Sequence, residues 1–364
     1  MAKIFLTGAS GYIGGDFLHL LNKLHPEYQV KALVRDATKI EAVKKAFDSN
    51  QVQVVEGDLD DSISSMTDIQ YLFPILITSF PDLAASGHFQ SVEAIHQALS
   101  TRFRDHSSPY WIQISGGSVV AAAEVTNKTR ISGAGSDFIW DDLLDIEALK
   151  TFIKNYPYRK VDNYMLDVAT ASPHINTAVV IPPMIYGPGR GPFNQRSVQL
   201  PNLARETLKR RRAFQVGPGE SRWSSIHIRD LSQIIVRLVE KAVEGKKDEN
   251  LWGLAGLYFT GVGELSLSEL SAQIASAAAS ANLLSDTSVE ELDADQFESL
   301  LPHGNVLYGT NVRYGASRAR KHLDWEPKEE SLEETISATV RAEAKSLGVI
   351  RTSESYSPLK AHAM

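Results

Sequence analysis

The chain has 364 residues, of which 43% are hydrophobic and 22% are charged, and this composition excludes a disordered, fibrous or coiled-coil protein. Its 37 Lys and Arg residues are outnumbered by 44 Asp and Glu residues, so the net charge of -7 provides no overall basic field for nucleic acid or an anionic membrane. The absence of cysteine excludes disulfides, a thiolate nucleophile and a metal held by cysteine.

The first residues predict the compartment. Residues 1–7 lead directly into a glycine loop, without the apolar run and small-residue cleavage site that are typical of a secretory signal. The longest apolar stretch, residues 71–77, contains Pro74 and is far shorter than the ~20 residues that a membrane-spanning helix needs. We therefore expect a cytoplasmic protein that binds neither a membrane nor nucleic acid.

Short β-type runs alternate with helical stretches over the first half of the chain. The strand candidates are residues 3–6, 30–34, 52–55, 75–78, 111–114 and 178–181. The helix candidates, in which apolar residues recur with helical spacing, are residues 14–24, 38–47, 91–103, 141–154 and 159–170. Strands that alternate with helices predict an α/β fold with a Rossmann-type, doubly wound parallel sheet.

The composition changes after the last of these strand candidates, where Pro, Gly and Arg become frequent. We expect residues 1–187 to form the Rossmann domain, and residues 188–225 together with residues 261–350 to form a smaller, interleaved C-terminal substrate lobe. Residues 226–260 contain a helix and a strand candidate that are expected to return to the first domain. Residues 351–364 are expected to be a frayed tail.

A glycine-rich loop, residues 7–14, joins the first strand candidate to the first helix candidate. Glycine lets the backbone turn tightly and approach a pyrophosphate, and the N–H groups at the start of a helix favour anionic oxygen. A simple tight turn is the alternative, but the position between a strand and a helix favours a dinucleotide site. The residues expected to bind the cofactor here are Thr7, Gly8, Ser10, Gly11, Tyr12, Ile13 and Gly14.

The end of the second strand candidate predicts which dinucleotide binds. Arg35 stands where NAD-binding proteins place an acid against the ribose 2′-hydroxyl, and a guanidinium instead suits a 2′-phosphate. We therefore expect NADP(H), with a solvated surface arginine as the alternative. Asp58 is expected either to accept a hydrogen bond from the adenine amino group or to cap a helix or turn. The remaining cofactor residues expected in this half are Leu59, Thr78 and Ser79.

Several segments, taken in order, resemble the signatures of one protein superfamily. Besides the glycine loop, they are residues 57–59, 114–119, 181–189, 226–231, 314–320 and 323–327. Together they resemble the extended short-chain dehydrogenase/reductase superfamily, especially its fungal-type epimerase/dehydratase and NmrA-like members. The resemblance implies that Pro182, Pro183 and Ile185 line the nicotinamide and that the C-terminal lobe covers the substrate.

The resemblance also implies a Ser or Thr after the fifth strand and a Tyr-x-x-x-Lys motif on the next helix. Tyr156 and Lys160 have this spacing, and either Ser115 or Ser118 is expected to supply the hydroxyl. On one helical face, the lysine would lower the pKa of the tyrosine and hold the nicotinamide ribose while the phenol exchanges a proton with a carbonyl or alcohol. Ser115 and Lys160 are accordingly expected to contact the cofactor as well.

A second register of this motif is also considered. Pro157 is tolerated only near the start of a helix, and an acid four residues beyond the lysine position fits better if Tyr158 replaces the lysine and Lys154 replaces the tyrosine. In that register the Tyr156/Lys160 pair lies in a loop and on the surface. The phenols left to consider are then Tyr158 and Tyr186.

The leading hypothesis is an NADP(H)-dependent oxidoreductase that acts on the carbonyl or alcohol group of a small, rather apolar molecule. One alternative is an NmrA-like regulator or sensor that binds NADP(H) without turnover, and another is an isomerase or dehydratase with a retained cofactor. A homodimer is considered as the assembly. His227 is expected to be packed rather than catalytic, and no residue spacing indicates a metal site.

Overall fold

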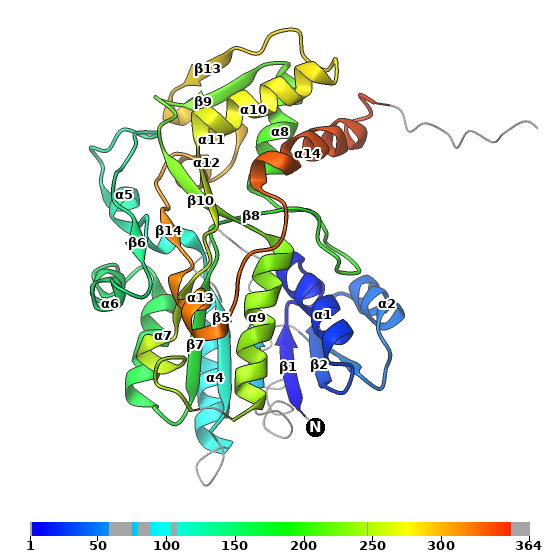
Figure 1. The fold of residues 1–364 in the computed structure, drawn as a ribbon, viewed down its shortest axis with the longest axis vertical. Coiled ribbons are helices and arrows are strands. Elements are labelled where there is room, and N and C mark those ends of the chain that lie inside the picture. The colour runs from blue at the N-terminus through cyan, green and yellow to red at the C-terminus, as the bar shows by residue number, and fades with distance from the viewer. Residues whose placement is uncertain (1, 58–74, 79–87, 103–107, 246, 351–364) are drawn as a thin grey trace, which may run out of the picture.

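The computed structural model of the protein describes residues 2–57, 75–78, 88–102, 108–245 and 247–350. Its centre is a seven-stranded sheet in the order β11-β7-β5-β4-β1-β2-β3, in which all neighbouring strands are parallel (Figure 1). The strands are β1 Lys3–Thr7, β2 Gln29–Val34, β3 Val52–Glu56, β4 Ile75–Thr78, β5 Tyr110–Ile114, β7 Asn176–Ile181 and β11 Leu257–Phe259. The predicted α/β fold with a doubly wound parallel sheet is confirmed.

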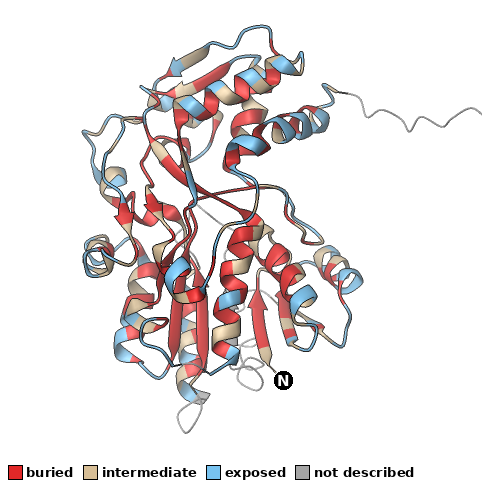
Figure 2. Cartoon of the chain, viewed as in Figure 1, coloured by how far each residue is buried: buried red, intermediate tan, exposed pale blue. Residues whose placement is uncertain are grey.

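Helices cover both faces of this sheet, because its strands alternate apolar side chains between two cores. Ile4 and Leu6 of β1 belong to one core together with apolar residues of α1 and α9, whereas Phe5 belongs to the other with residues of α4 and α7. The helices are α1 Tyr12–Leu24, α2 Ala37–Ala46, α4 Phe89–Arg102, α7 Lys160–Ala171 and α9 Ile228–Val243. Figure 2 shows β5 and β7 buried along their length, as expected for central parallel strands.

After β7 the chain leaves the sheet and later returns to it. A separate three-stranded sheet has the order β12-β10-β8, with β8 Met184–Tyr186, β10 Arg222–His227 and β12 Gly263–Ser266. Between β10 and β12, α9 packs against α1, and β11 pairs in parallel with β7. The structure thus connects the two parts of the molecule by several crossings of the chain.

A second group of elements lies above the carboxyl ends of the sheet strands (Figure 1). Its helices α8, α10 and α14 contact one another, and β9 pairs with β13. The elements are α8 Gln199–Arg210, β9 Ala213–Val216, α10 Leu267–Ser280, β13 Val289–Leu292, α11 Ala294–Leu300, α12 Gly304–Leu307 and α14 Leu332–Ser346. Capping boxes at Ser266 and Ser331 fix the starts of α10 and α14.

The region between β5 and α7 differs from the expected helix at residues 141–154. The chain forms β6, Trp140–Asp141, which pairs with β14, Tyr314–Gly315, and α6 begins only at Ile146 and ends at Lys154. The Asp141 carboxylate accepts hydrogen bonds from the backbone N–H groups of Leu143 and Leu144, which makes a turn where helix was expected. The remaining short elements are η1 Gly117–Val119, α5 Ala122–Thr126, η2 Gly253–Ala255 and α13 Ser317–Leu323.

Candidate functional site

The glycine loop forms an open helix start at the carboxyl end of β1. Gly8 has a φ of +74°, and a Cβ on Gly14 would lie 2.2 Å from the Gly8 carbonyl oxygen, so both positions require glycine. Gly11 precedes α1 without any side-chain cap, and the first turn carries no acidic residue. The N–H groups at this helix start therefore suit an anionic group such as a pyrophosphate.

A cavity of about 370 Å³ lies next to this loop. On one side it is lined by Pro183 and Ile185, the residues that resemble a nicotinamide-lining segment. Pro182 precedes them, and its carbonyl accepts a hydrogen bond of 2.8 Å from the Gly117 N–H. The other lining residues are Gly8, Ser10, Gly11, Tyr12, Ile13, Lys39, Phe193, Asn194, Arg196, Val198 and Gln199. The glycine loop and the expected nicotinamide segment thus meet in one cavity.

Residues 187–198, which we call the strap, cross the start of α1. The Tyr12 hydroxyl donates a hydrogen bond of 2.5 Å to the Gly187 carbonyl, and burial raises the pKa of this phenol, so it stays a donor. Farther along, Arg190 donates from Nε and Nη2 to the carboxylate of Asp16 at 2.9 and 2.7 Å. A Cβ on Gly15 would lie 3.0 Å from the Gly191 Cα, so the backbones touch. These contacts hold the strap against the cofactor loop.

Asp16 is fully buried beneath the strap. Burial by itself raises the pKa of the carboxyl group, but hydrogen bonds from Arg190 and from the Ser232 hydroxyl outweigh burial and hold the pKa below its ordinary value. The carboxylate is therefore ionised at neutral pH. The helix α1 thus carries a buried negative charge that fixes the strap.

The expected ribose end of the site contains two cationic side chains. Arg35 directly follows β2 and is exposed, and Lys39 lines the cavity with its ammonium group 5.2 Å from the centre of the Phe193 ring. Asp36, between them, accepts hydrogen bonds from the backbone N–H groups of Thr38 and Lys39 and so caps α2. Lys39 was not among the expected residues; its place in the first turn of α2, after Arg35, was the available signal.

Three of the expected cofactor residues cannot be located relative to the cavity. Asp58, Leu59 and Ser79 lie outside the described residues. Thr78 ends β4, between β1 and β5 in the sheet, so its backbone lies at the carboxyl edge where the glycine loop begins.

The expectation that Tyr156 and Lys160 share one helical face is wrong. Tyr156 lies in the turn before α7, and Lys160 is the first residue of that helix and is exposed. The Tyr156 ring packs against Phe152, with ring centres 4.9 Å apart. Pro157 within this turn explains the difference, because the helix starts only after it.

The alternative register agrees with the structure in placing Tyr156 in a loop and Lys160 on the surface, but its pairing of Lys154 with Tyr158 on one helix does not hold. Lys154 belongs to α6, not to the helix that follows Tyr158, and its ammonium group lies 2.6 Å from the exposed carboxylate of Asp167. Tyr186 is buried, and its hydroxyl donates to the carbonyl of Glu330 at 2.9 Å. Tyr158 is 41% exposed, more than Tyr156, whose ring it meets edge-on with the ring centres 6.3 Å apart, and it is the candidate phenol that remains in this turn.

Both expected serines belong to one polar network at the start of α7. The Ser115 hydroxyl donates to Asp162 Oδ1 at 2.5 Å, Asp162 Oδ2 accepts from Arg159 at 2.8 Å, and Arg159 Nη1 donates to Ser118 Oγ at 3.2 Å. Arg159 and Asp162 are buried, whereas the serines are half-buried. This ion pair was not among the expected features, although a spacing of three residues at a helix start is typical of such pairs.

Tyr158 lies directly before this network. Burial raises the pKa of its phenol, and the positive charge of Arg159 offsets only part of that effect. The phenol is therefore neutral at physiological pH and can donate a proton rather than accept one.

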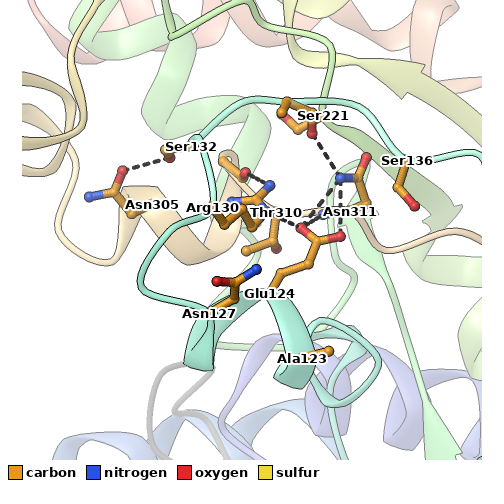
Figure 3. Close-up of polar contacts among 12 residues, drawn as sticks. Ala123, Glu124, Asn127, Arg130, Ser132, Ser136, Ser221, Asn305, Thr310 and Asn311 are labelled. Carbon is orange, nitrogen blue, oxygen red and sulfur yellow. Dashed lines mark hydrogen bonds and ion pairs between the residues drawn. The ribbon is translucent and has the colours of Figure 1, made fainter.

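The segment that follows Ser118 is anchored to the second group of elements (Figure 3). Glu124 of α5 forms an ion pair of 2.7 Å with Arg130 and accepts a hydrogen bond from the Asn311 N–H at 3.0 Å. Arg130 also donates to the carbonyl of Gly309, and the Ser132 hydroxyl donates to Asn305. These contacts hold residues 124–132 against the second group of elements.

His227 is buried at the end of β10, and its Nδ1 accepts a hydrogen bond from the Arg229 N–H at the start of α9. The His227 side chain is thus packed at the junction of β10 and α9, where its ring nitrogen caps the helix. In the described part of the chain, no cluster of His, Asp and Glu has the arrangement of a metal site. None of the helices in that part is long and apolar enough to cross a membrane.

Comparison with known proteins agrees with this geometry. Residues 1–101 match the NmrA-like family, and residues 119–251 match the NAD dependent epimerase/dehydratase family. An oxidase, ucsJ, of Acremonium sp is 34% identical over 357 residues, which cover 95% of this chain and 99% of the relative. The chain belongs to the extended short-chain dehydrogenase/reductase superfamily.

Solved structures of the superfamily share the fold over nearly the whole chain. A dTDP-glucose 4,6-dehydratase of Bacillus anthracis, solved with NAD, has a TM-score of 0.63 at 15% identity and covers 95% of this chain and 97% of its own. A UDP-glucuronic acid 4-epimerase of Bacillus cereus, solved with NAD, has a TM-score of 0.60 at 16% identity, covering 94% and 99%.

The protein is thus an enzyme of the short-chain dehydrogenase/reductase type. The alternative of a regulator without turnover is therefore set aside.

Proposed function

We propose that the protein is an NADP(H)-dependent oxidoreductase that acts on the carbonyl or alcohol group of a small, rather apolar molecule. The observation that carries this proposal is the junction of the glycine loop, Pro183, Ile185 and the strap in one cavity, with the Gly117 N–H hydrogen-bonded to the carbonyl of Pro182 next to it. The name of the Acremonium relative, an oxidase, supports redox chemistry.

NADP(H) is favoured by the charges at the end of β2. Arg35 and Lys39 place two cations near the expected ribose, whereas Asp36 is engaged by backbone N–H groups of α2. A 2′-phosphate gains charge-assisted hydrogen bonds in such surroundings, and a free 2′-hydroxyl lacks the carboxylate partner that NAD-binding proteins provide.

An apolar substrate is favoured by the cavity wall. Ile185, Phe193 and Val198 line the cavity beyond the glycine loop, and Phe193 is 47% exposed. A side chain of this size costs free energy in water, which a bound apolar molecule would recover.

The residues of this chain fit a simple mechanism. The residues of the glycine loop, with Pro183 and Ile185, would hold the dinucleotide, which when bound would supply hydride. Tyr158, neutral at physiological pH, gives its phenol proton to the carbonyl oxygen, and a serine hydroxyl of the network holds that oxygen in place. Because Tyr158 is 41% exposed, it regains its proton from water.

The test is the consumption of NADPH, followed by absorbance, with a panel of apolar aldehydes, ketones and quinones that includes decanal, benzaldehyde and phenanthrenequinone. We expect turnover with at least one compound, and none with the Gly14→Val variant, whose side chain would collide with the Gly8 carbonyl. A wild-type protein that binds NADPH but reduces nothing contradicts the proposal.

The match to the epimerase/dehydratase family favours one second candidate, an isomerase or dehydratase with a retained cofactor. Cofactor released on denaturation of the purified protein, together with no net consumption of added NADPH, would support that candidate instead.

A further inference from the structure

The two serines of the network differ in the direction of their hydrogen bonds. A carboxylate can only accept, so the Ser115 hydroxyl gives its single hydrogen to Asp162. A guanidinium can only donate, so Ser118 Oγ accepts from Arg159 and keeps its own hydrogen for another partner. Of the two, Ser118 is therefore the one with a hydrogen to give to a substrate oxygen.

Arg159 is held rigidly in this arrangement. Its Nε and Nη2 both lie 2.8 Å from Asp162 Oδ2, and the residue is 8% exposed. A paired, buried guanidinium keeps its charge and its orientation, and its electrostatic effect on a neighbouring hydroxyl is larger than it would be in water. A hydroxyl that accepts from a cation becomes a stronger donor on its other side.

The backbone places Gly117, the residue before Ser118, next to a residue that lines the cavity. Gly117 donates from its N–H to the Pro182 carbonyl, and a Cβ on Gly117 would lie 3.2 Å from the Cα of Pro183, which lines the cavity. Lys160, by contrast, is exposed on the first turn of α7. The positive charge of this corner of the site thus comes from Arg159.

We propose that Arg159, fixed by Asp162, is a positioning residue that orients and polarises the Ser118 hydroxyl toward the reacting oxygen, in the role first expected of Lys160. The inference rests on the proposed function. In a reduction, the carbonyl carbon receives hydride, the C=O π pair moves to oxygen, and that oxygen takes the Tyr158 proton. Ser118 donates a hydrogen bond throughout and loses no proton.

The experiment is a double-mutant cycle on Ser118→Ala and Arg159→Met, assayed with the panel carbonyl that the wild type reduces fastest. We expect each single variant to lower kcat by about 10²-fold, as for the loss of one donor to a developing oxyanion, with little change in KM or in the Kd of NADPH. Because Arg159 acts through Ser118, the double variant should be no slower than Ser118→Ala. Arg159→Lys keeps the positive charge but loses the contact of two guanidinium nitrogens with Asp162. It should therefore recover part of the kcat that Arg159→Met loses.

Matched controls come from the anchored segment of Figure 3. Arg130→Met removes an arginine, here half-buried, from a different ion pair, and Ser132→Ala removes a different hydroxyl donor, so both should retain kcat. Losses that simply multiply in the double variant would indicate separate structural roles and overturn the inference. So would a loss of kcat in Ser115→Ala that exceeds the loss in Ser118→Ala. A wild type that reduces no carbonyl instead contradicts the proposed function, and the inference with it.

Discussion

Arg190 of the strap and Asp16 of α1 are 174 positions apart in the chain and form a two-pronged ion pair around a fully buried carboxylate. The Arg190 N–H also donates to Asp16 at 2.8 Å, so the backbone of the strap is fixed as well as its side chain. This pair thereby adds to the Tyr12–Gly187 hydrogen bond and the Gly15–Gly191 backbone contact in joining α1 to the strap.

We expect Asp16→Asn to lower the free energy of unfolding by about 3 kcal/mol, because removing one partner leaves a poorly compensated charge beneath the strap. Urea unfolding followed by circular dichroism measures this difference. Lys154→Met, which breaks the exposed pair with Asp167, is the control and should cost less than about 1 kcal/mol. Equal losses in the two variants would contradict a structural role of the strap ion pair.

The same variant predicts a pH dependence. The pKa of Asp16 is lowered in the folded protein, so its ionised form contributes stability above the unfolded value of 3.8. The difference in unfolding free energy between wild type and Asp16→Asn should therefore shrink as the pH falls below that value. A difference that stays constant down to the acid transition would show that the charge of Asp16 does not matter.

Cofactor preference provides a second prediction. We expect NADPH to bind more tightly than NADH, and Arg35→Asp to weaken NADPH binding by about 10-fold or more, since a charge-assisted hydrogen bond is worth about 1.5–3 kcal/mol. Isothermal titration calorimetry with both dinucleotides measures the difference between the Kd values of NADPH and NADH. Lys44→Met, farther along α2 in an exposed pair with Glu41, should leave it unchanged. Equal affinities of the unmodified protein for the two cofactors would contradict a 2′-phosphate site.

A third prediction concerns the phenol of Tyr158. Tyr158→Phe should reduce turnover by about 10²–10⁴-fold and leave the Kd of NADPH nearly unchanged, as for the loss of a general acid. Tyr164→Phe is the matched control, because its hydroxyl contacts His96 between α4 and α7. Burial raises the pKa of Tyr158, so the carbonyl-reduction rate of the wild type should persist above the ordinary tyrosine value of 10.0. Full turnover in Tyr158→Phe would exclude this phenol.

A fourth prediction concerns Asp142 and the pH dependence of the free energy of unfolding. Its carboxylate is buried, accepts from the N–H groups of Phe259 and Arg318, and has a pKa that burial raises to about 7. Between the ordinary value of 3.8 and about 7, the folded protein holds a proton that the unfolded chain has lost. The free energy of unfolding should therefore fall as the pH rises through this window, and Asp142→Asn should remove that slope. A slope that is the same in both proteins would contradict the assignment.

The sheet was predictable because its strands are short apolar runs separated by helical spacing, and the glycine loop because it joins two such elements. The start of α7 was also predicted to within one residue, because the helix candidate at residues 159–170 begins just before Lys160, whereas the Tyr156/Lys160 spacing taken alone fits a helix equally well and could not show that Tyr156 lies outside it. Likewise, nothing in the sequence near Asp16 indicates Arg190, because contacts between distant segments depend on the fold. Ser115 and Ser118 could be named but not distinguished, because the direction of a hydrogen bond depends on its partner.

The return of the chain through α9 and β11 has a consequence for how the protein can be divided. A chain truncated after residue 187 would lack β11 and leave one edge of β7 without its strand partner. It would also expose the face of α1 that packs against α9. An open strand edge beside exposed apolar surface is a template for association with other chains, so such a fragment should aggregate even though it holds the whole glycine loop.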